Sequence, residues 1–252
     1  MRNNYDDEPA IQVCGVWKKF YIYQNRADSL KERVIFWGRQ RAEEFWALKN
    51  INLDVPRGKT LGLIGRNGSG KSTLLKIISR ILYPTRGEVR VNGRMSTLLE
   101  LGAGFHPDFT GRENIYLNAS ILGFTRREIK ERLSDIISFA ELGDFIDNPV
   151  RNYSSGMYMR LGFAVAVHVD PDILLIDEVL AVGDLAFQDK CLARIQELQK
   201  QGKTIVIVTH APKKVEELCD LALWLDRGEA RMLGPAKEVA QAYAGFIEAV
   251  AG

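Results

Sequence analysis

The most constraining feature of this sequence is a glycine-rich segment that joins a strand-like run to a helical one. Residues 59–64 form a short apolar run, residues 65–72 read GRNGSGKS, and residues 72–82 have the pattern of a helix. The segment fills every fixed position of the G-x-x-x-x-G-K-[ST] pattern, in the strand–loop–helix context that this pattern requires. Strands that alternate with helices build a parallel sheet covered by helices. The sequence therefore predicts an α/β fold organised around this turn.

The same segment predicts a phosphate-binding loop. Its glycines let the backbone curl so that successive amides point at an anion, and the following helix contributes its positive N-terminal end. Lys71 is expected to reach the β- and γ-phosphates of ATP, and Ser72 to ligate Mg²⁺. The alternative is a glycine-rich turn that only joins strand to helix, which the complete match disfavours. The expected ATP-binding residues of this segment are Gly65, Asn67, Gly68, Ser69, Gly70, Lys71, Ser72 and Thr73.

Two further apolar runs, 172–176 and 203–208, read as strands that are buried on both faces of a parallel sheet. The first run is followed by Asp177 and Glu178, at the strand end where ligands of open α/β sheets lie. We expect Asp177 to hold Mg²⁺ and Glu178 to polarise an attacking water; the alternative is a solvated strand end. His210 follows the second run and is expected to contact the γ-phosphate, although a lone histidine is more often structural. Lys71, Glu178 and His210 are thus the predicted catalytic residues.

Two capping boxes indicate a helical section between strand-rich segments. Thr110 is followed three residues later by Glu113, and Thr125 by Glu128, so each pair can satisfy two amides at a helix start. Gly143 then suits a helix C-terminus. We expect one domain with a nucleotide-binding core at 11–102 and 170–235, an insertion at 24–45, a helical subdomain at 103–169 and a C-terminal helix at 236–252.

Residues 152–157, which read NYSSGM, resemble the signature motif L-S-G-G-Q of the ABC ATPases. They lie between the glycine-rich loop and the acid pair, as in that family, although Ser155 replaces its glycine and Met157 its glutamine. The resemblance implies a P-loop domain with a mixed sheet and an inserted helical subdomain. It also implies a head-to-tail dimer, in which Ser154, Ser155 and Gly156 of one copy meet the ATP of the other. Asp184 matches the aspartate with which the family's next loop contacts the partner copy.

Two elements of the family match less well. ABC ATPases usually stack an aromatic side chain on adenine near the first strand; Phe20 is our first candidate and Tyr23 the second, with core packing as the alternative for each. The family also carries a glutamine before the signature motif that contacts Mg²⁺ and the membrane subunit. This chain has no glutamine from Gly65 to Asp184, and Glu100 is the nearest polar candidate for that metal contact.

Residues 98–107, 110–114 and 177–184 are similar to the ATPases that export polysaccharides such as O-antigen, capsule and teichoic acid. This resemblance implies a membrane-spanning permease as partner, a lipid-linked polysaccharide as cargo, and a place on the cytoplasmic face of the cell membrane. The alternatives are an ABC ATPase for another cargo, a soluble ABC ATPase, a P-loop kinase of a small metabolite and a nucleotide-gated scaffold. A fold-level analogy does not choose among cargoes.

Composition narrows these possibilities. The formal net charge of +2 argues neither for nor against nucleic acid, because basic binders usually carry a clustered excess; we expect no nucleic-acid partner. No apolar run approaches the roughly 20 residues needed to span a bilayer. Three widely spaced cysteines fit neither a disulfide framework nor a zinc site, which favours a reducing compartment. The basic insertion at 24–45 is either a contact with anionic lipid headgroups or a solvated loop.

Overall fold

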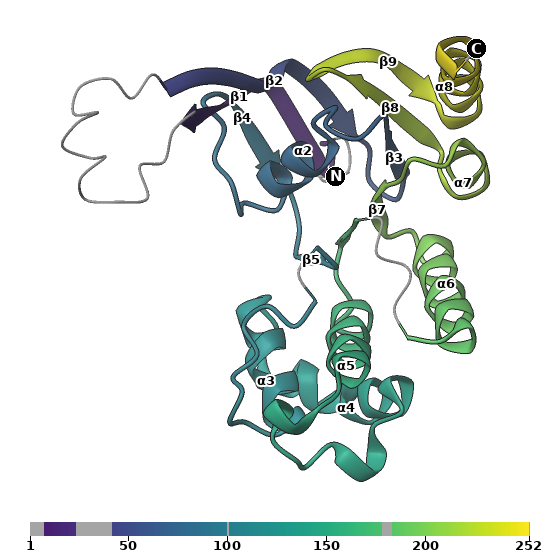
Figure 1. The fold of residues 1–252 in the computed structure, drawn as a ribbon. Coiled ribbons are helices and arrows are strands. Elements are labelled where there is room, and N and C mark those ends of the chain that lie inside the picture. Colours follow the sequence, from purple (N-terminus) through teal and green to yellow (C-terminus); the bar gives the residue numbers. More distant parts are fainter. Residues whose placement is uncertain (1–7, 24–41, 100, 178–182, 252) are drawn as a thin grey trace, which may run out of the picture.

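The computed structural model describes residues 8–23, 42–99, 101–177 and 183–251. Figure 1 shows two layers of sheet with flanking helices and, below them, a separate lobe made of helices. The helical lobe is built from the middle of the chain, as the capping boxes predict. Residues 24–41 of the predicted insertion lie outside the described residues, and so do the predicted site residues Glu100 and Glu178.

The first sheet is antiparallel and has the order β2-β1-β4. It contains β1 (Ile11–Tyr23), β2 (Ala42–Val55) and β4 (Arg86–Val91). The strands β1 and β2 form a long hairpin that stays paired as far as Tyr23 and Ala42. Residues 42–45 of the predicted insertion at 24–45 belong to β2 and continue its ladder with β1. Their alternating backbone hydrogen bonds to β1 outweigh the charged side chains that made them look like a loop.

The second sheet has the order β5-β6-β7-β3-β8-β9, and only β9 runs antiparallel to its neighbour. The strands β3, β6 and β7 are buried at every position, as their continuous apolar sequences predict. The mixed sheet thus places β3 and its glycine-rich turn at the centre. Its strands are β3 (Thr60–Ile64), β5 (Met95–Thr97), β6 (Ile173–Ile176), β7 (Thr204–Val208), β8 (Leu221–Asp226) and β9 (Glu229–Pro235).

Helices cover both faces of this sheet. The helix α2 (Lys71–Ile78) lies between the two sheets, where Leu74 and Leu75 join the same buried cluster as Leu61 and Leu63 of β3. On the other side, Tyr243 packs its ring against Trp224 of β8 with ring centroids 5.6 Å apart. The remaining helices of this part of the chain are α6 (Leu185–Lys200), α7 (Pro212–Leu218) and α8 (Ala236–Ala251).

The helical lobe contains α3 (Gly111–Ile121), α4 (Arg126–Ala140) and α5 (Ser155–His168), with short 3₁₀ turns at Gly143–Phe145 and Val150–Asn152. Both predicted capping boxes are confirmed, at Thr110 and at Thr125. The predicted end of α4 at Gly143 was wrong, because Glu141 already takes the left-handed conformation, with φ of 56°. The helix α4 thus ends two residues earlier than its glycine suggests.

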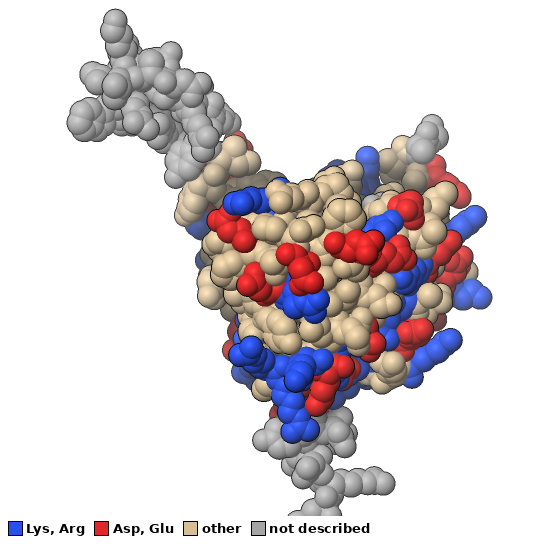
Figure 2. All heavy atoms as spheres, turned by 90° about the horizontal axis from the view of Figure 1, so that it is seen from below, with Lys and Arg blue, Asp and Glu red and all other residues tan. Residues whose placement is uncertain are grey.

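Ion pairs tie the surface of the helical lobe together. Figure 2 views the molecule from below Figure 1 and shows acidic and basic side chains interspersed over this face. Arg94, just before β5, donates to Glu128 at 2.7 Å, and this bond together with the capping bonds of Thr125 lowers the pKa of Glu128 to about 2. Pairs on such exposed surfaces contribute little to stability, because water and salt screen their charges. In the described parts of the chain, we find no helix that is long and apolar enough to cross a membrane.

Candidate nucleotide-binding site

The glycine-rich turn after β3 wraps around the ammonium group of Lys71. Lys71 begins α2 and is only 7% exposed, and its Nζ donates to the carbonyl oxygens of Gly65 at 2.7 Å and Arg66 at 3.0 Å. Gly70 precedes α2 in the left-handed region, with φ of 108°, and supplies no side-chain cap. The first amides of α2 therefore face the loop's interior with the positive end of the helix dipole behind them.

Close packing behind the loop explains why two of its positions hold glycine. A Cβ on Gly70 would lie 2.7 Å from Cδ2 of Leu48 and 2.8 Å from the carbonyl oxygen of Ala47, both on β2. A Cβ on Gly65 would lie 2.2 Å from the carbonyl oxygen of Leu225 on β8. The loop is therefore held between the antiparallel hairpin and β8, which fixes the concave shape that its backbone presents to a ligand.

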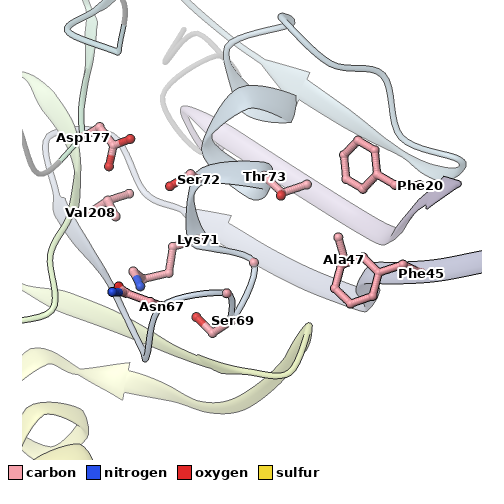
Figure 3. A pocket seen from close by; sticks show the side chains of 12 residues that line it. Phe20, Phe45, Ala47, Asn67, Ser69, Lys71, Ser72, Thr73, Asp177 and Val208 are labelled. Carbon is pink, nitrogen blue, oxygen red and sulfur yellow. The ribbon is translucent and has the colours of Figure 1, made fainter. Parts of the chain in front are cut away.

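A cavity of about 410 Å³ opens in front of this loop. Figure 3 shows Lys71, Ser72 and Asp177 toward one end of it, and Phe20 and Phe45 toward the other. The cavity brings together every predicted ATP-binding residue from Asn67 to Thr73, with Asp177 and Phe20. Its lining is Phe20, Phe45, Ala47, Asn67, Gly68, Ser69, Gly70, Lys71, Ser72, Thr73, Asp177 and Val208.

Phe45 is a lining residue that the sequence reading missed. It is the direct cross-strand partner of Phe20 in the β1–β2 ladder, so both rings project from the same face of the hairpin. The local sequence gives little signal for this, because two adjacent acids, Glu43 and Glu44, are followed by four adjacent apolar residues at 45–48 without alternation. Tyr23, the second candidate for stacking on adenine, pairs through its backbone with Ala42, and its side chain lies outside what the structure describes.

The residues of the cavity fit a magnesium nucleotide. Ser69 has a buried hydroxyl without a hydrogen-bond partner in the structure, so an incoming acceptor would satisfy an otherwise costly group. The Ser72 hydroxyl and the Asp177 carboxylate line the same part of the cavity, and such oxygen donors are the ligands that Mg²⁺ prefers. At the other end of the cavity, Phe20 and Phe45 provide flat apolar surface on which a purine ring can stack.

The signature segment lies away from this cavity in the same chain. Ser154 caps α5, its Oγ accepting from the Met157 amide at 3.2 Å, and Ser155 is the first residue of the helix. Gly156 is open, since a Cβ there would meet only Ser154 Oγ, at 3.8 Å. The C-terminal end of α5 leads to β6, so these residues stand about 20 Å farther out along a 14-residue helix. One copy of the chain therefore does not bring them to its own phosphate loop.

Two other predicted residues occupy element ends. Asp184 caps α6 by accepting from the Phe187 amide at 2.9 Å, and its second oxygen accepts from Arg160 of α5 at 2.8 Å. Arg160 also donates to Glu141 at 2.9 Å, so Asp184 is tied to the helical lobe. His210 follows β7 and is exposed, two residues after Val208, which lines the cavity.

Comparisons with known proteins agree with this geometry. The model of the family described as "ABC transporter" matches residues 48–181, which is more than half of the chain. A solved dimeric ATP-binding cassette with bound ADP and phosphate has a TM-score of 0.70 at 23% identity, covering 90% of this chain and 98% of that one. A solved ATP-binding subunit of an ABC transporter has a TM-score of 0.73 at 22% identity, covering 93% of each chain. The predicted fold is confirmed.

Curated relatives are more similar in sequence. The O-antigen export system ATP-binding protein RfbB of Myxococcus xanthus is 57% identical over 93% of this chain, which spans only 55% of that relative's length. RfbB of Klebsiella pneumoniae is 45% identical over 94% of this chain and 98% of its own. The teichoic acids export ATP-binding protein TagH of Listeria innocua is 47% identical over 94% of this chain and 70% of its own. The phosphate loop, the cassette fold and these similarities show that the chain belongs to the ABC transporter family and contains its ATP-binding domain.

Proposed function

We propose that this chain hydrolyses ATP to drive export of a lipid-linked polysaccharide through a separate membrane permease. The observation that carries the ATPase part is the cavity in which the phosphate loop, Asp177 and two aromatic rings converge. The export part is supported by the relatives, which are ATP-binding proteins of O-antigen and teichoic acid export. The chain would then work at the cytoplasmic face of the cell membrane, held there by the permease.

The residues that line the cavity would contact different parts of the nucleotide. Phe20 and Phe45 would flank the base, while the loop amides and Lys71 hold the phosphates. Ser72 and Asp177 would hold Mg²⁺, with Glu100 as a further candidate ligand. When bound, MgATP supplies the phosphoryl group whose transfer to water releases the energy for transport. Glu178 would orient that water and His210 would contact the γ-phosphate, so that charge developing on the phosphate is met by preorganised donors.

A second copy of the chain would complete the site. Ser154, Ser155 and Gly156 stand at the outer end of α5, where they are free to meet a nucleotide that another copy holds. A two-fold axis would make this contact mutual, because each copy presents the same two surfaces. Asp184, fixed to α5 through Arg160, would contact the partner beside them. The proposed assembly is a head-to-tail dimer that holds two ATP molecules between its subunits.

Replacing Glu178 by glutamine tests the ATPase proposal. We expect ATP binding to be retained, hydrolysis to fall at least a hundredfold, and a dimer to accumulate in the presence of MgATP, as measured by size-exclusion chromatography with light scattering. Glu131→Gln is the matched control, because it makes the same change on the exposed side of α4 and should hydrolyse ATP normally. Normal hydrolysis by Glu178→Gln would show that the assigned residue is not the base.

Purification from native membranes tests the export proposal. The tagged chain would be isolated in mild detergent, and the protein and lipid that accompany it identified by mass spectrometry. A multi-spanning protein with a polyprenyl-linked glycan is the expected result. A permease with a different cargo would overturn the export proposal and leave the ATPase proposal standing. Recovery without any membrane protein would point to a soluble ABC ATPase, and phosphate transfer to a metabolite instead of water would point to a kinase.

A further inference from the structure

We propose that Tyr158 is a positioning residue, which fixes the first turn of α5 to the turn at residues 101–105 that follows β5. The inference rests on the proposed function, because it concerns how Ser154 is presented to the ATP of the partner copy. Its consequence is a mechanical link between the two ATP sites of the dimer. The link runs from the Asp177 end of one copy's cavity to the signature residues that the same copy offers to the other.

The contact between Tyr158 and the turn is both polar and aromatic. Tyr158 Oη donates a hydrogen bond to the carbonyl oxygen of Gly102 at 2.9 Å. The amide of Phe105 donates to the same carbonyl oxygen, also at 2.9 Å, which closes the turn. The rings of Phe105 and Tyr158 then meet edge to face, with centroids 5.1 Å apart. The hydroxyl therefore holds the turn at Gly102, and the ring contacts its last residue, Phe105.

Two glycines, Gly102 and Gly162, allow the backbone of the turn to pack directly against α5. Gly102 has φ of 76°, and a Cβ there would lie 2.2 Å from Cε1 of Tyr158. Gly162 lies one helical turn after Tyr158 on the same face of α5, and a Cβ there would lie 2.7 Å from the amide nitrogen of Gly102. A contact with no room for a methyl group transmits displacement, because neither backbone can move toward the other.

Tyr158 and Ser154 belong to the same helical turn. The amide of Tyr158 donates to the carbonyl oxygen of Ser154 at 3.0 Å, while Ser154 Oγ caps the helix through Met157. A side chain that anchors Tyr158 therefore also sets the direction in which the Ser154 hydroxyl and its neighbours point. On the α3 side, Asn118 Nδ2 donates to the carbonyl oxygen of Ala103 at 2.8 Å, so the turn is held from both helices.

The other end of the link reaches the cavity through the sheet. The strand β5 is paired in register with β6, Thr97 opposite Leu175, and the amide of Leu98 donates to Leu175 at 2.8 Å. The same strand β6 leads directly into Asp177, which lines the cavity. A shift of β6 when Asp177 gains or loses its ligand would thus reach Ser154 through β5, the turn and Tyr158. The steps that the structure describes are the backbone bonds of β5 and Leu98 to β6 and the side-chain contact of Tyr158 with Gly102; the chain joins them through Glu100, which lies outside the described residues.

The test is Tyr158→Phe in the full-length chain, which removes the hydroxyl and keeps the ring. We expect kcat to fall about fivefold, the factor that corresponds to one ordinary hydrogen bond. The Hill coefficient for ATP should fall toward one. Binding of MgATP to the isolated monomer should stay within about twofold, because the cavity is untouched. Amide hydrogen exchange should become faster in two places together, the turn at 101–105 and the first turn of α5.

Thr125→Val is the control. The Thr125 hydroxyl donates to Glu128 Oε2 at 2.7 Å and accepts from the Glu128 amide at the start of α4, so this variant loses hydroxyl hydrogen bonds from the same lobe without touching the turn or the signature segment. It should keep the wild-type Hill coefficient and the wild-type exchange at 101–105. Equal effects of the two variants on the Hill coefficient, or unchanged exchange in Tyr158→Phe, would overturn the proposal. Amide hydrogen exchange does not require ATP hydrolysis. A wild-type chain without ATPase activity would therefore refute the proposed function, while the exchange measurement would still decide whether Tyr158 anchors the turn.

Discussion

Replacing His168 by glutamine should make the stability of the helical lobe less sensitive to acid. His168 is the last residue of α5, where its Nδ1 lies 2.9 Å from the carbonyl oxygen of Ala164 and its ring lies 4.7 Å from that of Phe139. Burial, with a smaller contribution from the positive charge of Arg194, lowers the pKa of His168 from 6.5 to about 4. The folded chain therefore holds this side chain neutral at pH values where the unfolded chain protonates it.

The sign and size of the effect follow from linkage. Because the folded pKa is the lower one, the unfolded state gains the proton first, and stability is lost as pH falls below about 6.5. With pKa values of 6.5 and about 4, the loss between about pH 7.5 and about pH 5 is about 2 kcal/mol. Below the folded pKa the loss levels off at about 3 kcal/mol, at 1.36 kcal/mol for each pKa unit.

Urea unfolding of the wild type and of His168→Gln at the two pH values measures this directly. Glutamine can still donate to the Ala164 carbonyl but does not titrate, so the variant should lose about 2 kcal/mol less than the wild type between those pH values. Ile136→Val provides a control, because trimming this buried side chain lowers stability by about 1 kcal/mol equally at both pH values. Parallel pH profiles for wild type and His168→Gln would refute the reasoning.

Two further predictions concern the cavity. Phe45→Ala should raise the dissociation constant for ATP about two- to tenfold, since an aromatic contact contributes about 0.5–1.5 kcal/mol; titration with a fluorescent ATP analogue would show this, and Phe109→Ala, which removes a similarly exposed ring elsewhere, should bind normally. Gly70→Ala should abolish ATP binding and lower the melting temperature, because it combines φ of 108° with a Cβ placed 2.7 Å from Leu48. Gly143→Ala, in open space, should change neither, and wild-type binding by Gly70→Ala would contradict the packing argument.

Patterns that are local in the chain were enough to predict much of the fold. The loop at 65–72, the capping boxes at Thr110 and Thr125, and the buried strands β3, β6 and β7 each depend on a few neighbouring residues. Glycine spacing, side-chain caps and apolar runs act over one turn or one strand, so sequence alone carries them. The roles of Glu178 and His210 were assigned from their places after predicted strands, and that of Glu100 from the resemblance; all three roles stay predictions.

What only the tertiary structure decided are the contacts between segments far apart in the chain. Phe45 joined the cavity because the β1–β2 register sets it opposite Phe20, and a ladder shifted by one residue would have turned it away. The approach of Leu225 to Gly65, and of Tyr158 to Gly102, depends on how β8 and α5 pack against those turns. The contact between Tyr158 and Gly102, for example, joins positions that are 56 residues apart in the chain. The sequence shows that a glycine is present, whereas the packing shows which neighbouring atom leaves no room for a side chain at that position.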